Sequence, residues 1–254
     1  MTAALSQDQN LIELLRDGRD LHCHTARYAF KVGRELSDAE FKKKYKNERQ
    51  KAKIVNFSMV YGGTEFTLMK NFGFSEQEAK MAVAGYFEGF PGVKVWMDKV
   101  YAHFTRHKQM AYPEFGYIKR MDMPDPLLEF QDPKAYQRQF RAALRTCQNA
   151  LIQGLSAFIV KKAIVGIARE LEERGFDAWV CLQIHDEIGC MARTTQAQEV
   201  QEVMMRHMQR TVEGVFLGAE PEIKATLSKS EAAIDLEDFL LEQELQALHM
   251  EMML

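Results

Sequence analysis

The stretch Ala178–Ala192, which reads AWVCLQIHDEIGCMA, alternates apolar and polar residues on both sides of a polar centre. This alternation predicts a β-hairpin with His185 and Asp186 at its turn. Most of the chain that precedes it instead carries apolar residues at helical spacing. The sequence therefore predicts an α+β fold that is mostly helical.

Several helices are expected around this hairpin. Ser75 and Glu78 form a capping-box signature before the apolar residues that follow. A connecting loop or irregular hairpin is expected between Met110 and Pro133, where prolines gather. The expected helices are Leu11–Arg16, Leu21–Phe30, Glu76–Gly89, Pro91 to about His107, Pro133–Glu173 with Gly154 as a candidate break, and Thr195–Glu213 with an apolar stripe of Val200, Val203, Met204 and Met208.

Composition is that of a folded protein. The chain has 254 residues, 46% hydrophobic residues and a formal charge of -3. A chain of this length can form one large domain or two small ones, and it lacks the high net charge of disordered proteins. The four cysteines contain no C-x-x-C pair, no signal peptide is evident, and no apolar run is expected to cross a membrane. We expect a reduced, cytoplasmic compartment.

Charge is unevenly distributed along the chain. From Ala219 to Leu254 the net charge is -7, which leaves +4 on the rest, and the segment Phe41–Lys53 (FKKKYKNERQKAK) holds seven Lys or Arg and one Glu. This asymmetry favours a polyanion-binding body with an acidic tail. The alternative is that the lysines form an ordinary solvated helix face.

Four residues in this region are spaced by four: Arg49, Lys53, Phe57 and Tyr61. On a helix they share one stripe. Two cations followed by two aromatic rings fit a nucleoside triphosphate, because the cations can hold phosphate oxygens and the rings can stack on sugar and base. The alternative is an amphipathic helix with its rings in the core and its cations in water.

Two further groups carry polar chemistry. Arg145, Asn149 and Gln153 are also spaced by four, and such side chains can donate to the acceptors that base pairs present in the minor groove. At the hairpin turn, His185, Asp186 and Glu187 are expected to be exposed, and an acidic turn suits Mg²⁺ capture. Asp is also favoured in turns for local reasons.

Together these motifs resemble the C-terminal part of family A DNA polymerases, the bacterial DNA polymerase I class. The Arg49–Gly62 stretch is similar to motif B of the fingers subdomain, Leu182–Glu187 to motif C of the palm, and Arg145–Gly154 to the helix along the primer–template minor groove. Asp20–Ala26 and Tyr86–Val93 agree as well. The resemblance runs from about Leu5 to about Glu222.

The resemblance implies a role for each matching residue. Arg49 and Lys53 would bind the triphosphate of the incoming dNTP and neutralise the leaving pyrophosphate. Phe57 would pack on its sugar and base, disfavouring dideoxynucleotides relative to a tyrosine there, and Tyr61 would lie near the templating base. Arg145, Asn149 and Gln153 would track the primer–template, with His185 at the primer terminus. Asp186 would bind catalytic Mg²⁺, and Glu187 would support it.

One departure from the family shapes the functional hypothesis. Two-metal nucleotidyl transfer needs more than one carboxylate, and the family supplies another from motif A, a D-x-S-x-x-E-type strand that we do not find. Asp8 and Asp20 are expected on surface helices and not as substitutes. We therefore expect a split DNA-directed DNA polymerase of a bacterial or phage-infected cell, whose partner fragment supplies motif A and the thumb. The expected parts are a fingers-like subdomain in 1–130, a partial palm in 131–226 and an acidic tail in 227–254.

Two other classes remain open. One is a non-catalytic DNA-binding remnant, which would bind duplex DNA without activity. The other is an interaction subunit of a replication complex, whose tail would dock through an apolar stripe. That stripe comprises Leu236, Phe239, Leu240, Leu245 and Leu248. The tail could equally fold back on the basic segment or be disordered.

Overall fold

The computed structural model describes residues 1–112 and 116–226. The chain divides into two compact units, each of which is described separately. The first comprises Met1–Leu155 with Val212–Val215, and the second comprises Ser156–Thr211 and the chain from Phe216 onwards. The acidic tail, with its predicted apolar stripe, lies outside the described residues.

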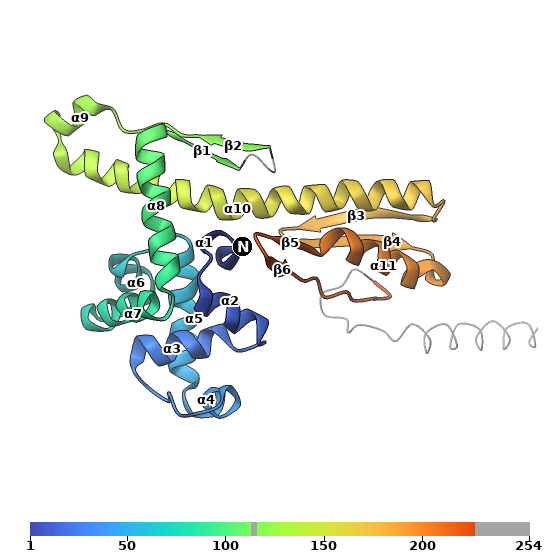
Figure 1. Ribbon diagram of the computed structural model, residues 1–254, viewed down its shortest axis with the longest axis horizontal. Helices are drawn as coiled ribbons and strands as arrows, with labels where there is room; N and C mark the ends of the chain where they lie inside the picture. Colours follow the sequence, from blue (N-terminus) through green and yellow to red (C-terminus); the bar gives the residue numbers. More distant parts are fainter. Residues whose placement is uncertain (113–115, 227–254) are drawn as a thin grey trace, which may run out of the picture. The chain divides into compact units, whose positions relative to one another are not determined.

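The first unit is mostly helical (Figure 1). Its helices are α1 (Thr2–Ser6), α2 (Gln9–Arg16), α3 (Leu21–Phe30), α4 (Asp38–Lys44), α5 (Lys46–Val60), α6 (Glu65–Phe72), α7 (Glu76–Gly89), α8 (Pro91–His107), α9 (Pro126–Gln131) and the first half of α10 (Pro133–Glu173). The strands β1 (Gln109–Tyr112) and β2 (Tyr117–Arg120) pair as an antiparallel hairpin between α8 and α9.

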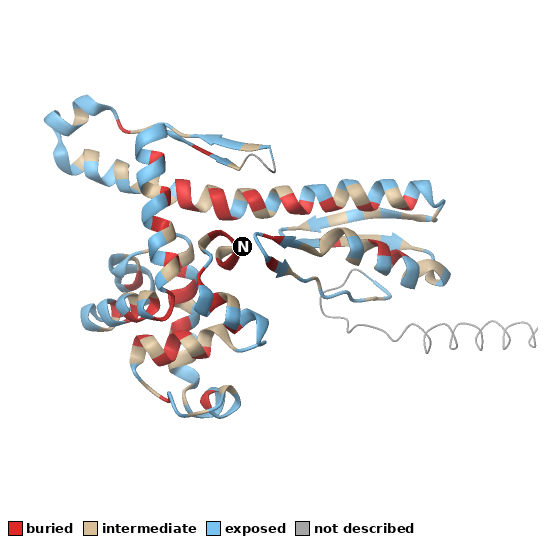
Figure 2. Cartoon of the chain, viewed as in Figure 1, coloured by how far each residue is buried: buried red, intermediate tan, exposed pale blue. Residues whose placement is uncertain are grey.

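Small residues of α3, α5 and α7 let these helices pack closely, with Phe41 of α4 completing their core. Cys23 and Ala26 of α3, Phe41 of α4 and Ala52 of α5 are fully buried and form one core cluster. Figure 2 shows how burial concentrates on the facing sides of these helices. Gly85 of α7 belongs to the same packing, because a Cβ there would lie 2.5 Å from Cα of Ala29. The α3–α5 and α3–α7 contacts therefore bring the helix axes closer than larger side chains would allow.

Asp8 and Asp20 are helix caps, so the expectation that they lie on surface helices is wrong. Asp8 is buried and caps α2 by accepting from the Leu11 amide at 2.9 Å, and it also accepts from the Gly92 and Val93 amides at the start of α8. Asp20 caps α3 through the amides of His22 and Cys23. Each carboxylate satisfies helix N–H groups that have no partner within their helix.

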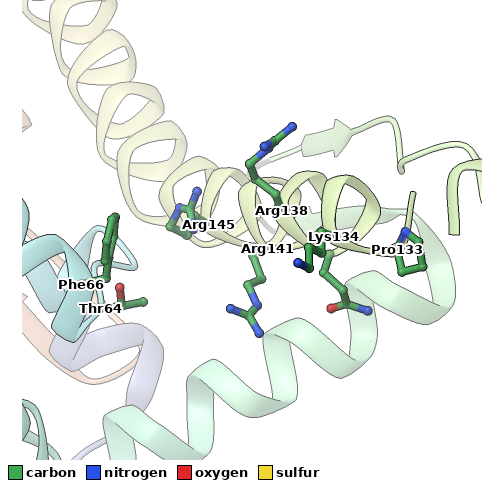
Figure 3. A pocket seen from close by; sticks show the side chains of 8 residues that line it. Thr64, Phe66, Pro133, Lys134, Arg138, Arg141 and Arg145 are labelled. Carbon is green, nitrogen blue, oxygen red and sulfur yellow. The ribbon is translucent and has the colours of Figure 1, made fainter. Parts of the chain in front are cut away.

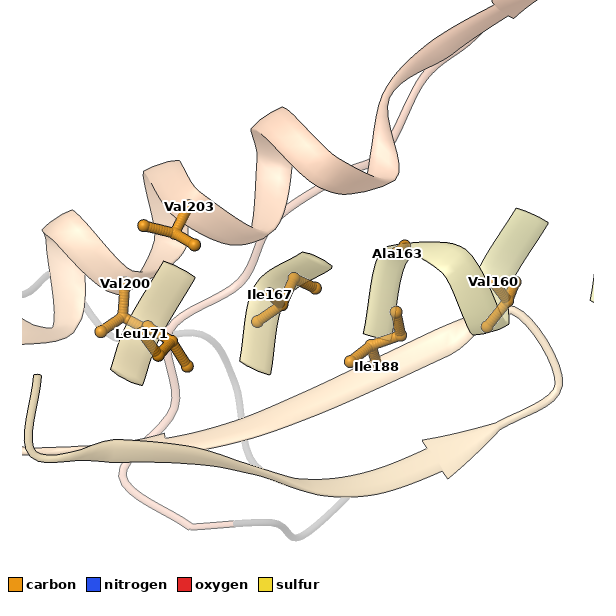
Figure 4. Close-up of a cluster of buried hydrophobic side chains, with 7 residues drawn as sticks. All are labelled: Val160, Ala163, Ile167, Leu171, Ile188, Val200 and Val203. Carbon is orange, nitrogen blue, oxygen red and sulfur yellow. The ribbon is translucent and has the colours of Figure 1, made fainter. Parts of the chain in front are cut away.

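The second unit packs a hairpin and a helix against the C-terminal half of α10. The strands β3 (Ala178–Ile184) and β4 (Glu187–Ala192) are antiparallel, with an irregularity between Val180 and Leu182. A 3₁₀ turn over Thr194–Gln196 leads into α11 (Ala197–Met208). The paired strands β5 (Arg210–Val212) and β6 (Val215–Leu217) follow, and the residues Val212–Val215 that join them belong to the first unit. The buried cluster of Figure 4 joins these elements through Val160, Ala163, Ile167 and Leu171 of α10, Ile188 of β4, and Val200 and Val203 of α11.

Most of the predicted elements are confirmed. The hairpin, its turn, the helices Leu21–Phe30, Glu76–Gly89 and Pro91–His107, and the Ser75–Glu78 capping box are present. The predicted helix Thr195–Glu213 is wrong at both ends, because α11 begins at Ala197 and ends at Met208 before a strand. Its apolar stripe does pack in the core.

Gly154 does not break α10. A Cβ at this position would lie 2.3 Å from the phenolic oxygen of Tyr117, which donates to the Ala150 carbonyl at 3.0 Å. The glycine therefore makes room for Tyr117 of β2 within a continuous helix.

One helix of the described chain, α10, is long and apolar enough to cross a membrane by length and composition alone. The expectation that no segment meets this criterion is therefore wrong. The core helix of a soluble protein passes the same test, and part of α10 is buried among the other elements of its units.

Replacing Asp8 by alanine should destabilise the first unit, because amides at the starts of both α2 and α8 lose their acceptor. We expect the free energy of unfolding to fall by about 2–4 kcal/mol, measured by urea denaturation. Asp17→Ala, at the exposed C-terminal end of α2, is the matched control and should change it by less than about 0.5 kcal/mol. Equal effects of the two substitutions would contradict the double-capping role.

Candidate functional site

The predicted strip on α5 faces solvent. Lys53 is exposed, and the rings of Phe57 and Tyr61 are 54% and 40% exposed. The opposite face of α5 is buried through Ala52, Val55 and Met59. Tyr61 itself is the C-terminal cap of α5 and lies just beyond its last turn. The alternative in which the aromatic rings face the core is therefore wrong.

Arg49 begins the strip in a half-buried ion pair. Its Nε and Nη2 donate to Oδ2 of Asp20 at 3.3 and 2.8 Å, and the amine of Lys42 lies 3.0 Å from the same oxygen. Burial alone would raise the pKa of the Asp20 carboxyl, but these cations and the Cys23 amide outweigh it and hold the pKa well below its usual range. Asp20 is thus ionised at neutral pH, and Arg49 retains donors for another anion.

The stretch of α3 behind the strip holds α5 through a buried amide. Oδ1 of Asn56 accepts from the Thr25 hydroxyl at 2.8 Å, and Nδ2 of Asn56 lies 2.8 Å from Nδ1 of His22. With Asn56 as donor, Nδ1 of His22 is the acceptor, and the neutral ring carries its proton on Nε2. Burial is the main cause that lowers the pKa of His22. The charge of Asp20 raises this pKa, and the cations Arg49 and Lys53 lower it further.

His22 was missed as a site residue by reasoning from sequence. Its ring lies 6.5 Å from the ring of Phe57, centroid to centroid, and it interacts electrostatically with Lys53. The sequence did contain a signal, because His22 belongs to the stretch Asp20–Ala26 that agrees with the family resemblance. His22 therefore adds a neutral N–H donor beside the cations and Phe57 of α5.

Two glycines end α5 where other side chains approach. Gly62 has a φ of +70°, and a Cβ there would lie 2.9 Å from Cγ of Arg145. A Cβ on Gly63 would lie 2.0 Å from the Ser58 hydroxyl oxygen. Gly62 thus lets α10 approach the end of the strip, and Gly63 leaves room for Ser58 of α5 itself, which gives an intramolecular reason for glycine at both positions.

The predicted face of α10 begins at this contact. Arg145, Asn149 and Gln153 follow one another along the helix, with Gln153 exposed and the other two half-buried. In the described part of the chain, the buried Oδ1 of Asn149 has no hydrogen-bond partner. Buried polar atoms are normally satisfied, so this acceptor is an exception on the predicted face.

A cationic pocket of about 580 Å³ lies between α6 and the start of α10 (Figure 3). It is lined by Thr64, Phe66, Pro133, Lys134, Gln137, Arg138, Arg141 and Arg145. The ring of Phe66 is exposed, and all four cations come from α10. Lys134, Arg138 and Arg141 were missed, although their spacing of four and three residues predicts a shared helix face. The pocket therefore combines one aromatic ring with a row of positive charge.

The hairpin turn belongs to the second unit. His185, Asp186 and Glu187 are exposed, and His185 has a φ of +54°. The carbonyl of His185 accepts from Nε2 of Gln183 at 2.6 Å, which fixes the turn from within β3. No group of three or more His, Cys, Asp or Glu side chains suited to a metal occurs among the residues described. Asp186 and Glu187 offer carboxylate oxygens, which Mg²⁺ prefers, but fewer than its six ligands.

The sequence model of DNA polymerase family A matches residues 1–228 of this chain. DNA polymerase I of Streptococcus pneumoniae strain R6 is 32% identical over 214 residues, covering 83% of this chain and 22% of that protein. The thermostable DNA polymerase I of Thermus aquaticus is 33% identical over 219 residues, covering 86% of this chain and 24% of the relative. The chain thus spans less than a quarter of the length of these relatives.

A similar solved structure is the POL domain of Pol1 from M. smegmatis in complex with DNA primer-template and dNTP. It matches with a TM-score of 0.71 and 26% identity, over 85% of this chain and 35% of that one. The similar solved structure and the sequence relatives are all DNA polymerases. The chain belongs to DNA polymerase family A.

Proposed function

We propose that this chain is part of a DNA-directed DNA polymerase, in which it binds the incoming dNTP and the primer–template and supplies one Mg²⁺-binding aspartate. The observation that carries the proposal is the solvent-facing strip of Arg49, Lys53 and Phe57, held from behind by α3. The similar POL domain of Pol1 was solved with a primer-template and a dNTP, which supports this assignment. Because the named relatives come from bacteria, we assign the reaction to the cytoplasm of a bacterial or phage-infected cell.

The strip would receive the nucleotide in order along α5. Arg49, Lys53 and the Nε2–H of His22 would donate to triphosphate oxygens, and these charge-assisted bonds would stabilise the leaving pyrophosphate. Phe57 would pack on the sugar and base, and Tyr61 at the end of the helix would lie by the templating base. Asp20 orients Arg49 for this task, since two of its N–H donors are already engaged.

The nucleic acid would meet two surfaces of the first unit. Arg145, Asn149 and Gln153 would follow the minor groove of the primer–template, where such side chains can donate to the acceptors that base pairs present. Phe66 and the cations of the pocket suit a single strand, because stacking and phosphate neutralisation together bind unpaired bases. The unpaired template strand is the part of the substrate that this chemistry fits.

The hairpin of the second unit would serve the reaction itself. Asp186 would hold Mg²⁺ with Glu187 in support, and His185 would contact the primer terminus. Mg²⁺, when bound, stabilises the attacking and leaving oxygens of nucleotidyl transfer. Because a two-metal site needs a further carboxylate, we propose that a complementary fragment carrying motif A and the thumb completes it. The fingers-like 1–130 and palm-like 131–226 parts belong to the same proposal.

Lys53→Ala tests the nucleotide strip. Because it removes a bond to a charged group, kcat/KM for dNTP in the assembled enzyme should fall about 10- to 150-fold, measured by primer extension. Lys51→Ala is the matched control on the same helix, because Lys51 pairs with Glu78 at 2.6 Å. An unchanged kcat/KM in the Lys53 variant would remove Lys53 from this role.

Arg138→Gln and Arg141→Gln test the pocket. Each should weaken binding of a single-stranded oligonucleotide and reduce the slope of log K against log salt by about 1, in fluorescence anisotropy titrations. Arg169→Gln, an exposed cation of α10 in the second unit, is the control and should leave the slope unchanged. A slope that does not respond to either pocket variant would contradict strand binding there.

Asp186→Ala should abolish synthesis by the assembled enzyme without preventing assembly. Asp177→Ala is the control, because this exposed acid pairs with Arg193 in the same unit. The assay is Mg²⁺-dependent primer extension by the chain alone and with a fragment that contains the D-x-S-x-x-E strand. Robust synthesis by the purified chain alone would refute the need for that fragment, and salt-sensitive DNA binding without activity in any combination would favour the non-catalytic remnant.

A further inference from the structure

Gln148 of α10 is a fully buried polar side chain that lies outside the predicted site. Its relative exposure is 0%, yet both ends of its amide are hydrogen-bonded. Nε2 donates to the carbonyls of Met59 and Val60 at 3.2 and 2.8 Å, and Oε1 accepts from the Tyr101 hydroxyl at 2.5 Å. A buried amide is tolerated only when satisfied in this way.

The two carbonyls belong to the last turn of α5. Helix ends leave carbonyl groups without partners in the helix. Here the Ser58 and Met59 carbonyls accept from the amides of Gly63 and Gly62, whereas the Val60 carbonyl receives the side chain of Gln148. Gln148 therefore supplies the donor that a further turn of helix would have given, and it connects the end of α5 to α10.

Tyr101 of α8 fixes the amide from its other side. Its hydroxyl donates to Oε1, so that Nε2 of Gln148 points at α5. Burial is the main cause that raises the pKa of Tyr101 to about 12, so the phenol keeps its proton at physiological pH. The chain of bonds from α8 through α10 to α5 is therefore uninterrupted.

The attachment point lies inside the nucleotide strip. Val60 directly precedes Tyr61 and follows Phe57 by three residues, and Gly62 packs against Arg145. The amide of Gln148 thus bonds the last turn of α5 directly to α10, beside the contact of Gly62 with Arg145.

We propose that Gln148, oriented by Tyr101, is a positioning residue for the nucleotide strip. It touches neither nucleotide nor DNA, and acts by holding the end of α5, with Phe57 and Tyr61, in register with Arg145 and Asn149. This inference rests on the proposed dNTP-binding role of α5.

The test is the dissociation constant for dNTP of the full chain with primer–template, measured by competition with a fluorescent dNTP. Gln148→Met keeps the volume and removes the hydrogen bonds, so we expect dNTP binding to weaken about 5- to 30-fold while DNA affinity stays within twofold. Tyr101→Phe should act in the same direction with a smaller effect. Gln196→Met, which removes one glutamine bond to the Asp177 amide in the second unit, should leave dNTP binding unchanged.

The double variant distinguishes positioning from a general loss of stability. Since both residues act through one bond chain, Gln148→Met with Tyr101→Phe should bind dNTP no worse than Gln148→Met alone. Unchanged dNTP binding in a folded Gln148→Met chain would overturn the inference, as would equal losses of dNTP and DNA affinity. If Gln148→Met does not fold, Tyr101→Phe decides by the same criterion. Failure of the proposed function would give a different result. In that case the wild-type chain would bind no dNTP, or the Lys53→Ala chain would bind dNTP as tightly as wild type.

Discussion

The buried amide of Asn56 is the constraint on which the candidate nucleotide site depends. It joins the Thr25 hydroxyl and the His22 ring of α3 to the inner side of α5. A buried polar group that lost these partners would carry its full desolvation cost, so the helices are held in one rotational register. That register turns Phe57 and Lys53 towards solvent.

The charged residues along and beside the strip differ in their partners and in their protonation. Asp20 forms ion pairs with Arg49 and Lys42, so the strip begins with an oriented cation. Lys53 has no ion-pair partner among the described residues. The His22 ring stays uncharged beside these cations, because burial and the charges of Arg49 and Lys53 lower its pKa. The proposed site thus combines one paired cation, one exposed cation without an ion-pair partner among the described residues, and one neutral donor.

The two ends of α5 are secured differently. Near its start an ion pair to Asp20 holds Arg49, and at its end a neutral amide, Gln148, holds the carbonyls of Met59 and Val60. An ion pair beside solvent is screened and tolerates small movements, whereas a fully buried amide is directional. The aromatic end of the strip is therefore held by the more directional contact.

Local patterns in the sequence determined the hairpin around His185 and Asp186, most of the helices and the spacing of Arg49, Lys53 and Phe57, because periodicity and capping act over a few residues. The family resemblance behind these motifs is confirmed, whereas the residue roles stay predictions. Only the tertiary structure decided that Asp8 also accepts from the start of α8, that Asp20 holds Arg49, that Gly154 accommodates Tyr117, and that Gln148 holds α5. These contacts join residues distant in sequence, and helical periodicity cannot state which helix a polar side chain will meet.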